Sequence, residues 1–287
     1  MKRFVAICAT LLFVSVLGAI SVGWMLGRPV QVRIGDPPAD LNAEPVNFES
    51  NSGANVHGWW CPVRNSRGAI LLLPGIRANR LSMLDRAHFL RRAGYSVLLI
   101  DFQATGETKG DRITFGWKES RDAIAAVNFI RNTEPASRVA VIGSSLGGVA
   151  TLLATPPLKV DALILEAAYP TIEIATTNRL ENYFGPLGRF AAPLLLKQLH
   201  MRLGISADDL RPIDHIARIS APVLIATGTR DDRATIAESA ALFERVRGPK
   251  RFWAAEGAEH VDLELHAPYE YRRQVLSFLV EKLQQLR

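Results

Sequence analysis

Gly143, Ser145 and Gly147 have the residue types and spacing of a turn that presents a nucleophilic serine. An apolar run, 139–142, precedes them and small residues follow, which predicts a strand, a sharp turn and a helix. Side chains at the flanking positions would collide with neighbouring backbone, so both are glycine. The helix N-terminus favours negative charge beside the hydroxyl. Ser145 is therefore the candidate nucleophile and the Leu146 N–H a candidate oxyanion donor, the alternative being a glycine-rich turn without chemistry.

A serine nucleophile needs a base and an acid, and in an open parallel sheet these lie beyond the carboxyl ends of other strands. His260 follows the last predicted strand, where it would take the serine proton and return it to the leaving group. Asp231 and Asp232 follow the preceding strand, and one of them would hold the imidazole tautomer. The spacing from Gly228 favours Asp231. His266 is close enough in sequence to be the rival base.

The elements that must position these residues alternate between buried strands and amphipathic helices. This alternation predicts an α/β fold with a mostly parallel central sheet and helices on both faces. The predicted strands are 46–48, 56–61, 69–73, 95–100, 137–142, 160–165, 222–227 and 251–254, and the predicted helices are 80–93, 117–131, 234–246 and 269–286. The pattern loosens over 169–215, where aromatics and prolines mix with short amphipathic pieces. We interpret this stretch as a small helical cap inserted between strands.

The chain from about residue 46 to its end resembles the α/β-hydrolase superfamily. The resemblance rests on 73–80, 94–102, 114–119 with Asp122, 143–148, Gly228 with Asp231, and Gly257 with His260. It is most similar to the membrane-anchored and secreted Bem46-like serine hydrolases. The resemblance implies that the N–H of Ile76 supplies the second oxyanion donor.

Two stretches depart from the family pattern. Pro74 stands where the family has histidine, and the loop 101–108 lacks the family's arginine and one glycine. We interpret Asp101 as structural. Glu119 and Asp122 match positions of the pattern, but a solvated first helical turn that complements the helix dipole is an equal alternative.

Composition bounds the class of protein. The chain has 287 residues and a formal net charge of +6, with the positive charge spread along the sequence rather than clustered. We therefore expect no nucleic-acid partner. The two cysteines have no zinc-site spacing, and no glycine loop suited to phosphate is present, so we expect no metal and no organic cofactor.

The N-terminal residues have the pattern of a membrane-targeting segment. Lys2 and Arg3 precede the uncharged run 4–26, which is long enough to span a bilayer, since a spanning helix takes about 20 residues. We expect an anchor over 1–28, a linker over 29–45 and a hydrolase domain over 46–287. The catalytic domain would then lie outside the cytoplasm, on the periplasmic side. The alternative is secretion after cleavage of a signal peptide.

These observations predict an enzyme that hydrolyses a carboxylic ester, thioester or amide through an acyl-enzyme. The expected substrate is a small-molecule or lipid ester near a membrane. Two alternatives remain open from the sequence. One is acyl transfer to an alcohol on the same three residues, and the other is a catalytically silent protein that binds a partner through its cap.

Overall fold

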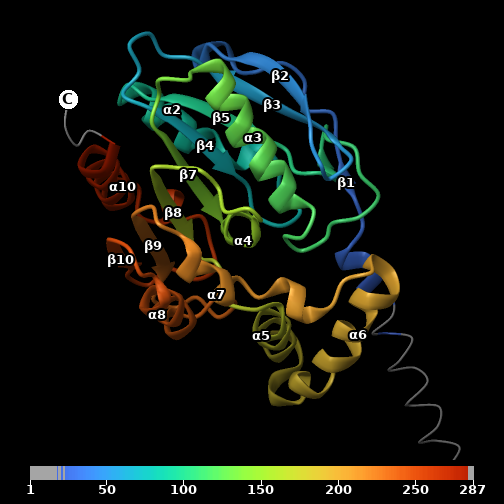
Figure 1. Cartoon of the computed structure of the whole chain (residues 1–287). Helices are drawn as coiled ribbons and strands as arrows, with labels where there is room; N and C mark the ends of the chain where they lie inside the picture. The colour runs from blue at the N-terminus through green and yellow to red at the C-terminus, as the bar shows by residue number, and fades with distance from the viewer. Residues whose placement is uncertain (1–17, 19–20, 22, 284–287) are drawn as a thin grey trace, which may run out of the picture.

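The computed structural model describes residue 18, residue 21 and residues 23–283, and its centre is an eight-stranded sheet (Figure 1). Its strand order is β10 (Lys250–Ala255), β9 (Val223–Gly228), β8 (Ala162–Glu166), β7 (Val139–Ser144), β4 (Ala69–Leu73), β5 (Ser96–Ile100), β3 (Asn55–Cys61) and β2 (Glu44–Glu49). Strand β3 is antiparallel to both of its neighbours, and every other pair in this sheet is parallel.

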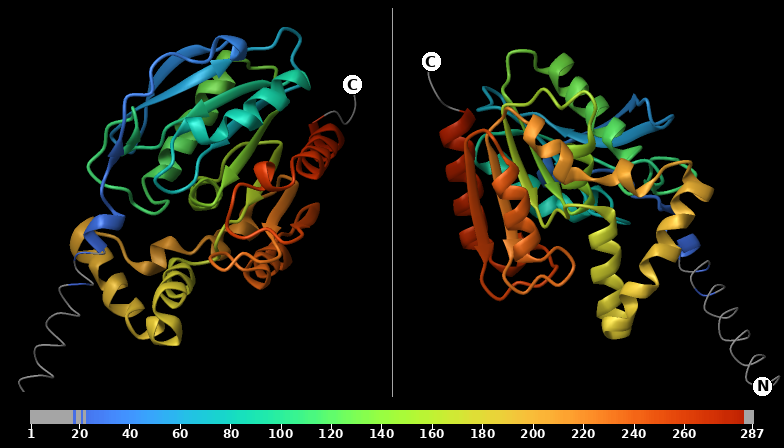
Figure 2. Two further views of the ribbon diagram at one scale, coloured as in Figure 1. Left: turned by 180° about the vertical axis from the view of Figure 1, so that it is seen from behind. Right: turned by 60° about the horizontal axis from the view of Figure 1, so that its bottom comes forward.

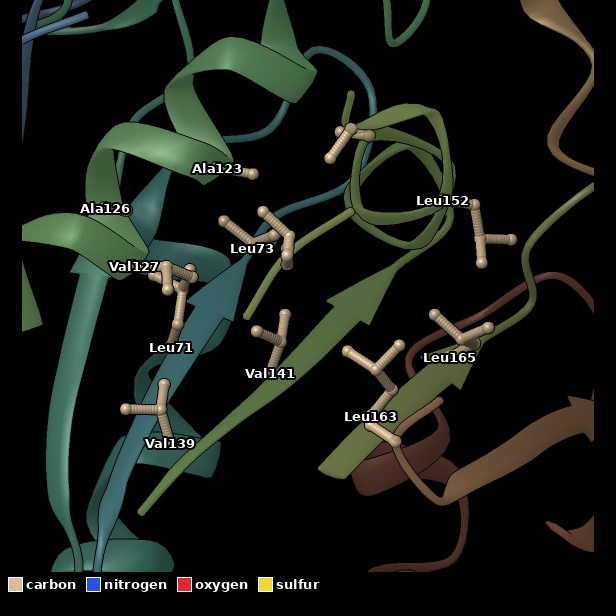
Figure 3. Packing of buried hydrophobic residues seen from close by; sticks show 14 of the residues in the cluster. Leu71, Leu73, Ala123, Ala126, Val127, Val139, Val141, Leu152, Leu163 and Leu165 are labelled. Carbon is tan, nitrogen blue, oxygen red and sulfur yellow. The ribbon is translucent and has the colours of Figure 1, made fainter. Parts of the chain in front are cut away.

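Both faces of the sheet are covered, which explains why the central strands are apolar throughout. One face packs against α3 (Glu119–Thr133), α4 (Leu146–Leu153) and α8 (Ile236–Arg245), and the other against α2 (Leu84–Arg92) and α10 (Pro268–Leu283). Leu71 and Val141 point to the first face, as Figure 3 shows, and their neighbours Leu72 and Ile142 belong to the second. The predicted α/β class, with a mostly parallel sheet between two helical layers, is confirmed.

The stretch 29–45 is not the free linker that its composition suggests. Val30–Gln31 forms β1, which pairs in parallel with β6 (Thr105–Gly106). The short 3-10 helix η1 (Ala39–Leu41) buries Leu41 completely, and β2 begins at Glu44. Backbone pairing and one buried side chain therefore hold this stretch on the domain, although its content of proline and aspartate is typical of a linker.

Six short helices follow β8 and precede β9 in the chain, and the first three of them lie beyond the carboxyl ends of the strands (Figures 1 and 2). They are α5 (Ile172–Phe184), η3 (Gly185–Phe190), α6 (Ala192–Leu203), η4 (Ala207–Leu210), α7 (Pro212–His215) and η5 (Ile216–Arg218). We call 169–215 the cap. Residues 23–26 are helical and lie beside α6 (Figure 1).

The predicted membrane anchor falls mostly on residues 1–17, 19–20 and 22, outside the described part of the chain. Among the residues that the structure describes, no helix has both the length and the apolar character needed to span a bilayer.

Candidate active site

Ser145 occupies the tight turn between β7 and α4 that the sequence predicts. Its φ is +48°, a conformation that L-residues adopt only at a cost in free energy. A Cβ on Gly143 would lie 2.5 Å from the Gly147 carbonyl carbon, and one on Gly147 would overlap the Leu73 carbonyl group. The N–H of Ser145 donates to the Glu166 carbonyl at 2.7 Å. Two glycines and one cross-strand hydrogen bond therefore hold the serine in its strained turn.

His260 lies between Ser145 and Asp231. The distance from Ser145 Oγ to His260 Nε2 is 3.4 Å, and that from His260 Nδ1 to Asp231 Oδ2 is 2.8 Å. The Asp231 carboxylate also accepts the N–H groups of Arg233 and Ala234 at 2.9 and 2.8 Å. Its side chain is completely buried, whereas the imidazole keeps 16% of its surface exposed. The Asp231 carboxylate is thus fixed from two sides, and the His260 imidazole faces the serine.

The loops that carry Asp231 and His260, the candidate acid and base, are hydrogen-bonded to each other. The Thr229 N–H donates to the Ala255 carbonyl at 3.0 Å, and the Arg230 N–H to the Ala258 carbonyl at 2.9 Å. In return, the Gly257 N–H donates to Thr229 Oγ1 at 2.8 Å. A side chain on Gly228 would overlap the Ala258 carbonyl group, so glycine permits this close approach. The relative position of acid and base is therefore set by backbone contacts.

The residues that competed with Asp231 and His260 lie elsewhere. Asp232 is exposed, and its carbonyl accepts a hydrogen bond from Asn182 of the cap at 3.2 Å. His266 is also exposed, and its Nε2 lies 3.0 Å from the Glu256 carbonyl oxygen. The structure therefore brings Ser145, Asp231 and His260 together and leaves Asp232 and His266 out.

Two backbone N–H groups are available beside Ser145. Leu146 is the first residue of α4, and Ile76 follows Gly75, whose Cβ position lies 3.8 Å from the Ser145 Cβ. Neither N–H donates a hydrogen bond to any other described residue. Ile76 also lines the same cavity as Ser145 and His260. Both predicted donors are therefore free to bind an oxyanion.

A cavity of about 440 Å³ opens over Ser145 and His260. The cap supplies most of its wall, which is mainly apolar, through residues that include Ile172, Leu180 and Leu195. Met25 and Leu26 also line it. From the sequence these last two residues are expected only in the N-terminal membrane segment, because an apolar run carries no sign that its end packs on a distant helix. The cavity suits an apolar group attached to the carbonyl that Ser145 would attack.

A buried ionic cluster lies next to the site, and the sequence did not predict it. Arg86 of α2 donates to the Glu166 carboxylate at 2.7 Å and to Asp262 at 2.7 Å. Tyr271 of α10 also donates to Glu166. Desolvation opposes the charge on Arg86, but Glu166 and its other partners outweigh it and raise the Arg86 pKa well above its usual value.

This cluster touches the site at two points. The backbone carbonyl of Glu166 holds the Ser145 N–H, and Asp262 lies two residues after His260. Arg86 therefore connects the strand beside Ser145 to the loop that carries His260. A charged residue on a helix that otherwise buries Ala87, Phe89 and Leu90 is the one signal that could have pointed to it.

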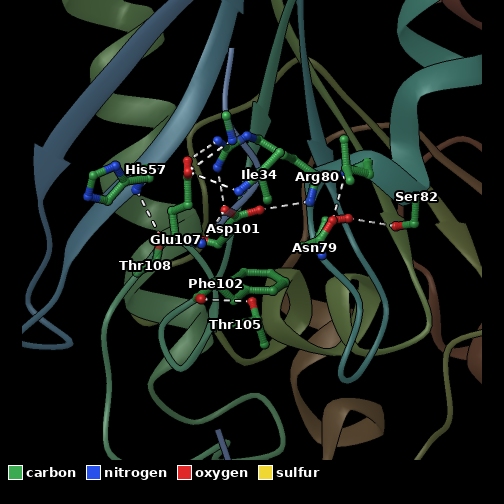
Figure 4. A network of polar contacts seen from close by, with 12 residues as sticks. Ile34, His57, Asn79, Arg80, Ser82, Asp101, Phe102, Thr105, Glu107 and Thr108 are labelled. Atoms are coloured by element: carbon green, nitrogen blue, oxygen red, sulfur yellow. Dashed lines mark hydrogen bonds and ion pairs between the residues drawn. The ribbon is translucent and has the colours of Figure 1, made fainter. Parts of the chain in front are cut away.

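A second buried ionic cluster holds the loop 101–108, which departs from the family pattern (Figure 4). Asp101 is fully buried and accepts the Arg80 N–H at 2.8 Å and the Glu107 N–H at 2.9 Å. The Arg80 guanidinium pairs with both Asp101 and Glu107. Burial opposes ionisation of Glu107, but the hydrogen bonds from Arg80, Gly35 and Ile34 lower its pKa to about 2. Arg80, which is not part of this loop, thus holds it in place through two carboxylates. The structural role predicted for Asp101 is confirmed.

The solvated first turn considered for Glu119 and Asp122 is wrong, because both residues are fully buried. Glu119 accepts hydrogen bonds from Thr114, Gly116 and Gln103. Asp122 accepts the Gln103 N–H at 2.8 Å. Both carboxylates lie in the first turn of α3 and also anchor neighbouring loops through these hydrogen bonds, which a local charge pattern cannot reveal.

Comparisons with known proteins find relatives of this chain. The family model described as serine aminopeptidase, S33, matches residues 64–211. The uncharacterized protein Rv2307c of Mycobacterium tuberculosis is 32% identical over 228 residues, which is 77% of this chain and 73% of that protein. The uncharacterized protein YqkD of Bacillus subtilis is 26% identical over 231 residues, 79% of this chain and 76% of that protein.

Among solved structures, the esterase Pf2001 of Pyrococcus furiosus has the same fold. The two align with a TM-score of 0.74 over 90% of this chain and 98% of that one, at 22% sequence identity. The α/β-hydrolase fold expected from the sequence resemblance is therefore confirmed.

Proposed function

Because this chain belongs to the serine aminopeptidase S33 family of the α/β-hydrolase superfamily, we propose that it is a serine hydrolase acting through an acyl-enzyme on Ser145. The observation that carries the proposal is the series of contacts from Ser145 through His260 to Asp231 beneath an apolar cavity. We propose a carboxylic ester or thioester as the bond cleaved, ahead of an amide, because these bonds are easier to break and the cavity suits an acyl chain.

In the proposed mechanism, His260 Nε2 accepts the hydroxyl proton as Ser145 Oγ attacks the carbonyl carbon. The N–H groups of Ile76 and Leu146 hold the negative charge on the carbonyl oxygen. His260 then gives the proton to the leaving alkoxide or thiolate, which departs and leaves the acyl-enzyme. A water molecule, deprotonated by His260, releases the acid. Asp231 keeps the Nδ1 proton on the ring and stabilises the imidazolium.

Rapid mixing with an activated ester tests this function. We expect the purified protein to release p-nitrophenol from p-nitrophenyl butyrate in a burst equal to the enzyme concentration, followed by slower turnover as the acyl-enzyme hydrolyses. Acyl transfer is distinguished by adding an alcohol, which would then accelerate turnover and yield the transferred ester. The absence of any burst and of any turnover would contradict both reactions and favour the silent binding protein.

We also propose that the N-terminal segment, residues 1–28, tethers the protein to a membrane, with the catalytic domain on the outer side of that membrane and the end of the segment packed on the domain. The support is the uncharged run behind Lys2 and Arg3. The full-length protein should stay in the membrane fraction after alkaline carbonate extraction. Release of intact full-length chain would contradict the tether, and a mature N-terminus near Gly23 would instead indicate a cleaved signal peptide.

A further inference from the structure

The cavity over Ser145 shares a wall with a second cavity of about 270 Å³. We call the first the near chamber and the second the far chamber. Their common lining consists of Leu26, Phe115, Ile172, Thr176 and Leu195. These five residues therefore form the wall between the two chambers, which we call the waist.

The far chamber is built from two parts of the chain that lie far apart in the sequence. Trp24 and Arg28 of the N-terminal segment line it on one side, and Leu196, Leu199 and Leu203 of α6 on the other. The rest of its lining combines apolar residues, among them Pro29 and Phe115, with the polar or charged side chains of Asp111, Arg112, Gln198 and Arg202. The far chamber thus exists only where residues 23–28 lie against the cap.

Specific contacts hold the N-terminal segment in this place. The Ile113 N–H donates to the Gly27 carbonyl at 3.0 Å, and the Arg77 guanidinium donates to the Met25 carbonyl at 3.0 Å. The Gln198 side chain of α6 lies directly against Gly23, with its Oε1 2.5 Å from the position that a Cβ on this glycine would take. The segment is therefore fastened to the domain on one side and fits closely against the cap on the other.

We propose that these two chambers together bind one long unbranched acyl chain, and that residues 23–28 are part of the substrate site. The carbonyl lies at Ser145, which rests on the proposed function, and the chain passes the waist into the far chamber. The near chamber alone already has the size of a small-molecule site, roughly 300–1,000 Å³. The far chamber therefore adds length, and each buried methylene adds about fourfold in affinity.

Binding of free fatty acids tests the chain site without requiring turnover. In the full-length protein, laurate should displace the fluorescent fatty acid cis-parinarate at a concentration at least about 100-fold below butyrate, because its additional methylenes are buried. Equal concentrations of laurate and butyrate would overturn the proposal.

Variants at the waist locate the site. Thr176→Trp should weaken laurate binding about 100-fold, since the indole would close the passage. Leu26→Trp should do the same from the N-terminal segment, which keeps the test decisive if the Thr176 variant does not fold. Thr177→Trp is the matched control, because Thr177 is adjacent and lines neither chamber, and it should change laurate binding by less than about threefold.

Ester turnover separates this proposal from the hydrolase itself. Thr176→Trp should lower the ratio of kcat/KM for p-nitrophenyl laurate to kcat/KM for p-nitrophenyl butyrate about 100-fold, because only the longer chain needs the passage that the indole closes. Equal losses on both esters, or no loss of laurate binding in either waist variant, would overturn the chain site. Tight laurate binding that is sensitive to the waist variants, without turnover of any ester, would support the chain site and overturn the proposed hydrolysis.

Discussion

The helix that follows Ser145 and the helix that opens the cap differ sharply in burial. All eight residues of α4 are buried, whereas only Ile172 and Leu180 are buried among the thirteen of α5. At the tip of the cap, four large apolar side chains are between 64% and 76% exposed, namely Tyr183, Phe184, Leu187 and Phe190. The proposed chemistry thus rests on a closely packed scaffold, and the proposed substrate wall on a lightly packed one. Substitutions in the two regions should therefore affect different quantities.

The largest expected effect is on the rate when the reacting groups of the scaffold are removed. Ser145→Ala and His260→Ala should each lower kcat for p-nitrophenyl butyrate by about 10⁴–10⁶-fold, and the double variant should be no worse. Their thermal unfolding should match that of the unaltered protein, because neither side chain is part of the packed core. Near-full activity in a folded Ser145→Ala variant would eliminate the acyl-enzyme mechanism.

Asp231 and Asp232 provide the matched control for this prediction. Asp231→Ala should cost less than loss of the serine, about 10³–10⁴-fold, because the acid orients and stabilises the imidazole. Asp232→Ala should change kcat by less than about threefold, since Asp232 is exposed and has no contact with His260. The reverse order of the two effects would reassign the acid.

The next effect concerns stability of the scaffold. Arg86→Met should lower the free energy of unfolding by about 3–5 kcal/mol, because Glu166 would remain buried without its cationic partner. Arg92→Met, on the exposed side of the same helix, should cost less than about 0.5 kcal/mol. Urea unfolding followed by tryptophan fluorescence measures both. Equal costs would show that the buried cluster contributes no specific stability.

The features that could be predicted from the sequence are those whose determining residues lie close together in the chain. The turn at Ser145 was predictable because two glycines and the strand before it lie within a few residues. Asp231 and His260 were placed by the rule that strand ends meet at one edge of a parallel sheet. The pairing of Arg86 with Glu166 was not predictable, because 80 residues separate them and the sequence around each residue does not identify its partner.

The same limit applies to the N-terminal part of the domain. Pairing of Val30 with Thr105 requires knowing where the loop after β5 lies, and composition alone favours a linker. The burial of Asp122 depends likewise on a distant partner, Ser50, whose hydroxyl donates to it at 2.6 Å. Long-range contacts of this kind leave no periodic trace in the sequence.

A pH-dependent effect should follow from Asp122 on the scaffold side. Burial raises its pKa from 3.8 to about 6, in spite of hydrogen bonds from Ser50, Ser52 and Gln103 that lower it. The folded state therefore binds this proton more tightly than the unfolded state. The resulting stabilisation is complete below about pH 4 and is lost as the pH rises through about 6, a change of about 3 kcal/mol.

Asp122→Asn isolates this contribution, because the variant cannot ionise there. The difference in free energy of unfolding between the unaltered protein and the variant should shift by up to about 3 kcal/mol between about pH 4 and pH 7, against the unaltered protein at higher pH. Urea titrations at a series of pH values measure it. A difference that stays constant over this range would refute the raised pKa.

The smallest effect should come from the tip of the cap. Phe190→Ala should change the free energy of unfolding by less than about 0.5 kcal/mol, because its ring is already exposed to solvent. Leu152→Ala in the buried helix α4 is the contrasting control and should cost about 2–5 kcal/mol. A large loss for Phe190→Ala would mean that the cap tip is packed against something in solution, and the contrast between the two regions would fail.

Covalent labelling tests the central claim most directly. A fluorophosphonate probe reacts with a serine only where a base activates the hydroxyl and donors stabilise the resulting oxyanion. We expect one phosphonyl group per chain, located by mass spectrometry on the tryptic peptide that contains Ser145, and no labelling of His260→Ala. A folded protein that remains unlabelled, or that carries the label on another serine, would contradict the account of Ser145 as an activated nucleophile.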